Sequence, residues 1–274
     1  MMIPLEDEFC DVMGKVLRGT NMTPGILEFL TGVPEATIET VLDGEPDECT
    51  VRRLAPALGL DGESLVAMMT GKSAPPAIEV PGLRAFNVAF DDMTVNYYVV
   101  WDATSKRALM FDTGANADEA LEWMAHEGLS LDAVLLSHSH LDHIADVEKV
   151  RARYPEARVL MNAYEACEGV ERFLPGQSFQ FGGFEVGTAM VRGHSPGATV
   201  YTVTGLSRRL VVVGDALFAR SMGGPLISLD GALEGARQAI FSLPDDTVLC
   251  PGHGPLTTVA DEKTNNPFFP EFKD

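Results

Sequence analysis

Three of the six histidines of this 274-residue chain lie within six consecutive residues, in the segment His138-Ser-His-Leu-Asp-His143. The segment follows an apolar run that predicts a buried strand, and a helical pattern begins directly after it. Side chains two residues apart on an extended segment point the same way, so His138 and His140 can converge on one ion. Asp142 and His143, around the turn, face a neighbouring position. Imidazole nitrogens and carboxylate oxygens suit zinc, so we expect a strand that ends at a metal site.

Two more histidines lie where a strand-like run breaks into a loop rich in glycine and proline. His194 lies in Gly193-His-Ser-Pro-Gly197, and His253 lies in Pro251-Gly-His-Gly254. The sixth, His126, falls on the polar part of a predicted helix and is expected on the surface. An incidental polar turn is the alternative explanation of the histidine run, but the repeated placement of histidines beside strand ends favours a metal site.

Strand-like and helical patterns alternate from residue 83 onward, which predicts a layered α/β domain. The strand-like runs are 93–101, 107–111, 133–137, 158–161, 198–204, 210–213 and 247–250, and the helical patterns are 117–127, 144–154 and 231–243.

Residues 5–71 have a different pattern, with apolar residues at helical spacing and breaks at glycines, which predicts a bundle of about five helices. The segment Lys72-Ser-Ala-Pro-Pro-Ala77 has the composition of a linker. We therefore expect a small all-α domain at residues 1–75 and the α/β domain at residues 76–274. A chain that begins near Ala77 is expected to fold and to keep its metals.

The histidine motifs, followed by Gly214-Asp215 and Pro251-Gly-His-Gly254, resemble the metallo-β-lactamase superfamily over residues 80–274. The resemblance implies an αββα sandwich, in which two mixed β-sheets are flanked by helices and the metals lie at one edge. It implies that Asp215 bridges two metals, and that Asp112, in Phe111-Asp-Thr-Gly114, orients groups around them. It assigns His138, His140 and His194 to the first metal, and Asp142, His143 and His253 to the second.

Two divalent ions are therefore the expected cofactors, with zinc as the expected metal and iron or manganese as alternatives. Such a pair lowers the pKa of a bridging water from 15.7 toward ~7 and so supplies hydroxide at neutral pH. This hydroxide would attack an acyl carbonyl in a metal-dependent hydrolase. Asp142 is the expected catalytic residue, because its carboxylate can orient the hydroxide and accept its proton.

Within the superfamily the chain is similar to the glyoxalase II-like branch, the hydroxyacylglutathione hydrolases. The similarity lies in Gly214-Asp-Ala-Leu-Phe218, in 249–255 and in 262–268, and it implies cleavage of a thioester. The chain ends about twenty residues after His253, so we expect no C-terminal helical domain of the kind with which longer members hold glutathione. Arg220 and Tyr164 are candidates for substrate binding, Arg220 because its loop is expected at the mouth of the site.

The persulfide dioxygenase branch resembles the chain in the same motifs and uses one iron held by two histidines and one aspartate. It is the alternative enzyme class. About two zinc ions per chain would favour hydrolysis, and about one iron would favour oxygen chemistry.

The segment 31–65 resembles the helix-turn-helix domain of phage repressors, in which the helix at 35–42 would enter the major groove. This helix offers Glu35 and Glu39 and no basic side chain, and residues 1–75 hold five Lys and Arg against thirteen Asp and Glu. A metal- or metabolite-responsive DNA-binding regulator is therefore the weaker alternative. A domain that forms a homodimer or covers the hydrolase site is the preferred interpretation.

The net charge of −20 opposes binding to nucleic acid and to anionic lipid, so a small molecule is the expected partner. No apolar run approaches the ~20 residues that cross a membrane, and the first residues carry acids instead of a secretory signal. A cytoplasmic protein is expected. The four cysteines have no Cys-x-x-Cys spacing, which favours reduced thiols.

Overall fold

Two six-stranded mixed β-sheets face each other in the computed structural model, which describes residues 3–273. The first sheet has the order β1-β2-β3-β4-β5-β6, and the second has the order β12-β11-β10-β9-β8-β7. The strands of the first are Leu83–Phe90, Met93–Trp101, Arg107–Phe111, Ser130–Leu136, Arg158–Asn162 and Glu171–Phe173, numbered β1 to β6. The strands of the second are Ser178–Phe181, Phe184–Met190, Thr199–Thr204, Leu210–Gly214, Val248–Pro251 and Thr257–Thr258, numbered β7 to β12.

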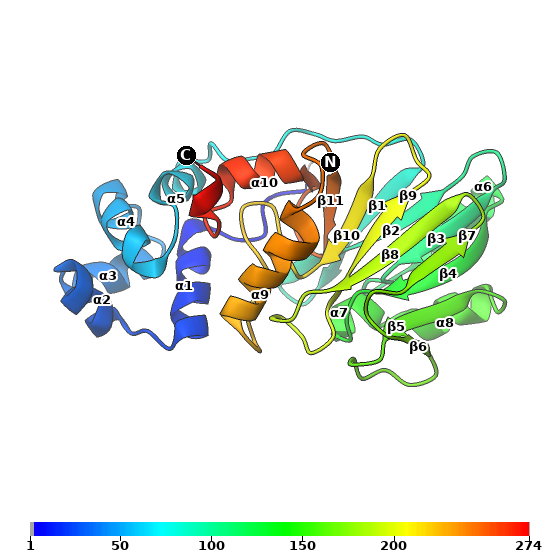
Figure 1. Cartoon of the computed structure of the whole chain (residues 1–274), viewed down its shortest axis with the longest axis horizontal. Coiled ribbons are helices and arrows are strands. Elements are labelled where there is room, and N and C mark those ends of the chain that lie inside the picture. Colours follow the sequence, from blue (N-terminus) through cyan, green and yellow to red (C-terminus); the bar gives the residue numbers. More distant parts are fainter. Residues whose placement is uncertain (1–2, 274) are drawn as a thin grey trace.

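Helices cover the outer face of each sheet. In the first sheet β3, β4 and β5 run parallel, which requires crossover connections. These are α6 (Asp118–Glu127), then α7 (Leu141–Ile144) and α8 (Val147–Arg153). Over the second sheet lie α9 (Leu229–Ala236), which continues as η2 (Arg237–Phe241), and α10 (Val259–Asn265), followed by η3 (Pro270–Phe272) (Figure 1). The predicted αββα sandwich is therefore confirmed.

Apolar side chains fill the space between the sheets because each strand presents one face to its partner sheet. Tyr98, Phe111 and Leu135 of the first sheet belong to the same buried cluster as Phe184 and Tyr201 of the second. The central strands are buried on both faces, so they read as near-continuous apolar runs.

The N-terminal region is helical, as predicted. Its elements are α1 (Phe9–Thr20), α2 (Pro24–Thr31), α3 (Glu35–Leu42), α4 (Glu48–Leu54), η1 (Ala55–Leu58) and α5 (Gly62–Met69). Thr23, Asp47 and Asp61 begin α2, α4 and α5, and each side chain accepts a hydrogen bond from a free backbone N–H of the first turn. Among residues 3–273, no helix is long and apolar enough to span a membrane.

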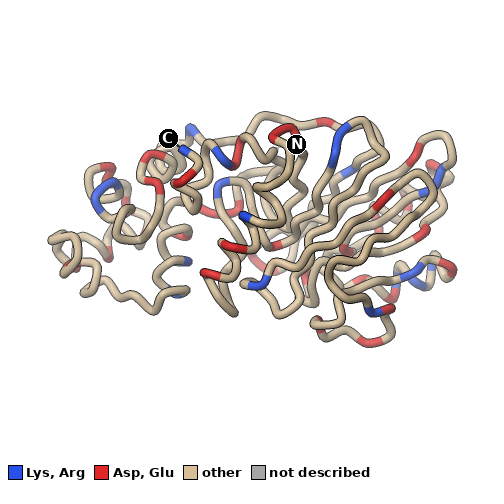
Figure 2. Tube along the Cα trace, viewed as in Figure 1, with Lys and Arg blue, Asp and Glu red and all other residues tan. Residues whose placement is uncertain are grey.

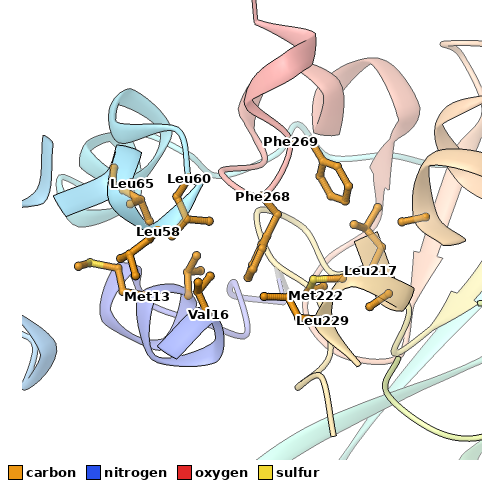
Figure 3. Packing of buried hydrophobic residues seen from close by; sticks show 14 of the residues in the cluster. Met13, Val16, Leu58, Leu60, Leu65, Leu217, Met222, Leu229, Phe268 and Phe269 are labelled. Atoms are coloured by element: carbon orange, nitrogen blue, oxygen red, sulfur yellow. The ribbon is translucent and has the colours of Figure 1, made fainter. Parts of the chain in front are cut away.

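One hydrophobic core runs across the expected boundary at residues 75 and 76. Met13 and Val16 of α1, with Leu65 of α5, belong to the same buried cluster as Met222 and Phe268 (Figure 3). Figure 1 shows α1 between the other N-terminal helices and α9. The linker marks a change of local pattern, but the packing continues past it.

Candidate metal centre

The candidate residues gather at one edge of the sandwich because each follows the end of a strand. The segment from His138 to His143 follows β4, Asp215 follows β10 and His253 follows β11, while His194 lies in the turn between β8 and β9. His126 lies on the surface of α6 with a side chain that is 83% exposed. The structure therefore brings together seven residues that are up to 115 positions apart.

Three groups in this cluster could hold a metal ion, since in each group one candidate ligand atom per residue lies within 4.8 Å of the others. The groups are His138, His140 and His194; Asp142, His143 and His253; and, between them, His138, His143 and Asp215. The first two are the sets that the resemblance implies.

The ring nitrogens of the first group face one another. Nδ1 of His140 lies 3.0 Å from Nε2 of His138 and 2.9 Å from Nε2 of His194. In the second group, Nε2 of His253 lies 3.3 Å from Oδ2 of Asp142.

Asp215 lies within reach of both groups. One of its carboxylate oxygens lies 3.3 Å from Nε2 of His143, and the other lies 3.4 Å from Nε2 of His194. Burial by itself raises the pKa of Asp215, but His253 and His143 outweigh it and hold the pKa well below the usual range. Asp215 therefore carries a negative charge at the centre of the cluster.

Two polar atoms at this centre lie 3.3 Å from each other but make no hydrogen bond of good geometry, with each other or with any other group. They are Nε2 of His143 and Oδ1 of Asp215, and both are buried. A buried polar group without a partner is costly, so such an atom needs an explanation such as an ion or a water. The donor set of nitrogens and carboxylate oxygens suits a divalent transition metal.

Hydrogen bonds behind the histidines fix which ring nitrogen faces the centre. Nδ1 of His143 donates to Asp112 at 2.9 Å, that of His194 to the carbonyl of Gly224 at 2.9 Å, and that of His253 to the carbonyl of Thr94 at 2.7 Å. In the neutral ring, each Nε2 then carries the lone pair that a metal ligand requires. The carboxylate of Asp112 also accepts from the backbone and hydroxyl of Ser137, both at 2.7 Å.

The loops approach so closely that two positions have no room for a side chain. A Cβ on Gly252 would lie 2.1 Å from Oδ1 of Asp215, and one on Gly223 would lie 2.2 Å from the Asp215 carbonyl oxygen. Glycine in the Pro-Gly-His-Gly motif therefore lets β11 bring His253 beside Asp215.

The first group of the cluster is more exposed than the second. His138 and His143 are fully buried, and His253, Asp215 and Asp142 are nearly so, whereas His140 and His194 are partly exposed.

Glu165 is a structural part of this site that the sequence analysis missed. It is 4% exposed, and its carboxylate accepts from the backbone and hydroxyl of Ser139, from the hydroxyl of Ser195 and from the backbone of Gly197. Glu165 thus joins the loop after β4 to the loop that carries His194. The only indication of this role in the sequence is that Glu165 follows closely after β5, the strand next to β4.

The structure corrects the expectation for Arg220. This side chain is 2% exposed and lies against α10, where its guanidinium donates to Glu262 at 2.5 Å, to Asp261 at 2.7 Å and to the carbonyl of Ser73 at 2.7 Å. A buried arginine with these partners cannot also bind a substrate carboxylate. Tyr164 is 52% exposed, with the guanidinium of Arg192 5.3 Å from its ring, and its role stays a prediction.

The two mixed sheets and the histidine-rich strand ends define a class of protein. The sequence model of the Metallo-beta-lactamase superfamily matches residues 90–253, and the chain belongs to this superfamily.

Among its relatives is a probable metallo-hydrolase of Streptococcus pyogenes, 32% identical over 200 residues, which are 63% of this chain and 84% of the relative. Hydroxyacylglutathione hydrolase GloC of Haemophilus influenzae is 24% identical over 197 residues, which are 63% of this chain and 92% of the relative.

Solved structures show the same fold. The BLEG-1 B3 metallo-beta-lactamase has a TM-score of 0.59 at 26% identity and covers 68% of this chain and 99% of its own. ETHE1 from Myxococcus xanthus also has a TM-score of 0.59, at 23% identity, and covers 70% of this chain and 90% of its own.

Proposed function

We propose that this protein is a two-metal hydrolase that cleaves an acyl bond, with thioesters as its substrate class and zinc as its metal. The observation that carries the proposal is the pair of buried, unpartnered atoms on His143 and Asp215, between two groups of three potential ligands. In this proposal His138, His140 and His194 would hold one ion, Asp142, His143 and His253 would hold the other, and Asp215 would be within reach of both.

Two divalent ions, when bound, supply Lewis acidity that lowers the pKa of a water toward ~7 and polarises an acyl carbonyl. The charge of Asp215 offsets the repulsion between two cations at short range. Asp142 is nearly buried, and although burial raises its pKa, the hydrogen bond with His253 and the charge of His143 outweigh it and lower the pKa. Its carboxylate is therefore ionised and can orient the attacking water. Because a lowered pKa also makes it a weaker base, orientation is its first role.

The thioester assignment is supported by sequence likeness. The segments 214–218 and 249–255 resemble the glyoxalase II-like branch, and one relative is named a hydroxyacylglutathione hydrolase. The acyl group would enter beside His140 and His194, the most exposed residues of the cluster.

A screen of hydrolysis with zinc-loaded protein on thioester, lactone, phosphodiester and β-lactam substrates tests the proposal. We expect turnover of thioesters and about two zinc ions per chain by elemental analysis. Turnover of another class alone would replace the substrate assignment. About one iron per chain, with oxygen uptake when a persulfide is added and with no hydrolysis, would show instead the reaction of the persulfide dioxygenase branch.

The N-terminal helices offer little to nucleic acid. The helix α3 presents Glu35 and Glu39 and no basic side chain, and acidic positions outnumber basic ones over these helices (Figure 2). A homodimer through these helices stays a prediction; the exposed apolar residues Ile26, Phe29 and Leu30 of α2 are the surface available for it.

A further inference from the structure

The segment that precedes α1 lies against the loop that carries His253. A Cβ on Gly254 would lie 3.3 Å from the backbone nitrogen of Glu6 and 3.7 Å from the carbonyl oxygen of Pro4. Oε1 of Glu6 lies 3.8 Å from Nδ1 of His253. Figure 1 shows the segment before α1 beside β11, from where it runs to α1. The segment lies outside the residues that match the superfamily.

Lys15 of α1 fixes the segment to a second loop of the site. Its ammonium is nearly buried, pairs with Asp7 and donates to the carbonyl of Met222 at 2.7 Å. The same ammonium lies 5.1 Å from the ring of Phe218, whose ring lies 5.3 Å from that of His253. A buried lysine is costly unless it is paired, so these contacts hold Asp7, α1 and the loop after Asp215 together.

The apolar face of α1 keeps this arrangement in place. Val16 and Met13 pack in one cluster with Leu217, Met222 and Leu229 of the loop and of α9 (Figure 3). The place of Glu6 beside His253 is therefore supported by the buried contacts of the α1 residues that follow it.

A carboxylate in this position acts on the second group through His253. Nδ1 of His253 already donates to Thr94, so Glu6 adds negative charge behind a ring whose Nε2 faces the centre. The Glu6 side chain is 21% exposed, and solvent screens its field only in part. Negative charge behind a histidine ligand raises its affinity for a cation.

We propose that the N-terminal helical unit is part of the metal centre, with Glu6 as a positioning residue that strengthens binding of the ion at Asp142, His143 and His253. The pair of Lys15 and Asp7 keeps Glu6 at this ion and keeps the loop after Asp215 in place. The inference rests on the two-metal function proposed above.

Competition between the metal-free full chain and a chromogenic chelator for Zn²⁺ gives the affinity of each binding step. Glu6→Gln keeps the shape of the side chain and removes its charge. We expect the Zn²⁺ affinity of one binding step to fall about 10-fold, the effect typical of losing a group that interacts with a metal ligand from behind. The affinity of the other step should stay unchanged. Glu28→Gln, at an exposed acid of α2 with the same change of charge, should leave both steps unchanged.

A spectroscopic measurement separates this role from general stabilisation. In Co²⁺ titrations of Glu6→Gln, the visible absorption that grows with the second equivalent should need about 10-fold more free Co²⁺, and the absorption of the first should not shift. Lys15→Met should weaken the same step and speed hydrogen exchange at residues 216–223.

The outcomes are distinct for the two proposals. Two ions per wild-type chain with equal affinities in wild type and Glu6→Gln would overturn the role of Glu6 and leave the function intact. Fewer than two ions per wild-type chain would overturn the two-metal function, and this inference with it. Equal weakening in Glu6→Gln and Glu28→Gln would show an effect of net charge and would also overturn the role of Glu6.

Discussion

At the scale of single residues, the direction in which each histidine presents a lone pair determines what the site can bind. Asp112 accepts from Nδ1 of His143 and from Ser137, whose hydroxyl lies 3.0 Å from Nδ1 of His138. This one carboxylate therefore orients a histidine of each group, directly for His143 and through Ser137 for His138. The sequence suggested a supporting role for Asp112 but not these partners.

We expect Asp112→Asn to weaken metal binding by about 10- to 100-fold, because the amide cannot accept all three hydrogen bonds and its NH₂ group would face another donor. Chelator competition measures the change. Asp92→Asn, at an exposed acid in the turn between β1 and β2, is the matched control. Equal affinities in both variants would contradict the orienting role.

Removal of metal should make stability depend on pH through His253. Burial by itself lowers its pKa, but the carboxylates of Asp215 and Asp142 outweigh this and raise the pKa to about 9. The unfolded value is ~6.5, so the protonated ring stabilises the metal-free fold fully below pH ~6.5, and this contribution is lost as the pH rises through about 9.

Thermal unfolding of chelator-treated protein from about pH 6 to about pH 10 measures this dependence. We expect Tm to fall over that range, and to fall less in His253→Gln. The same slope in both proteins would contradict the assigned pKa.

At the scale of elements, the strands that carry the site were predictable and the contacts between their loops were not. The runs at 107–111 and 210–213 match β3 and β10 closely, because strands buried on both faces read as apolar runs. The helix expected at 144–154 is shorter in the structure, where α8 begins at Val147 and Ile144 belongs to the separate short helix α7. The helix expected at 231–243 is α9 followed by the π-helix η2.

Glu165 and Arg220 show why the loops were harder to predict. Glu165 binds segments more than 25 residues away on either side, and no local pattern encodes such contacts. Arg220 lies in a loop predicted at the mouth of the site, but the acids in the first turn of α10 turn its side chain inward.

We expect Glu165→Gln to loosen the loop of His194, because an amide cannot replace a carboxylate that accepts four hydrogen bonds. The free energy of unfolding should fall by about 1–3 kcal/mol, the cost of leaving buried donors without partners. Hydrogen exchange should speed up at residues 193–197. Unchanged exchange there, with unchanged stability, would show that Glu165 does not hold the loop.

At the scale of the whole molecule, the helical N-terminal region and the sandwich share a core, although the composition of 72–77 suggested two separable domains. Ser73 in that linker is buried, and its carbonyl accepts from Arg220. The composition of a linker indicates which backbone conformations it prefers. It does not indicate whether the apolar surfaces of the segments on either side pack against each other.

A chain that begins at Ala77 would expose apolar residues that α1 and α5 now cover, Leu217, Met222, Leu229 and Phe268 among them. In place of the independent folding expected from the sequence, we predict a lower Tm, binding of a hydrophobic dye and weaker metal binding. A soluble truncated chain with the Tm and metal content of the full chain would restore the two-domain interpretation.

The central claim is that Asp215 holds two ions together, and the metal content of Asp215→Asn tests it most directly. The neutral amide cannot offset the repulsion between two cations. Elemental analysis at saturating zinc should give about two ions in the wild type and about one in the variant, with hydrolysis slower by several orders of magnitude. Two ions in both proteins, together with equal rates, would contradict the claim that Asp215 holds the two ions together.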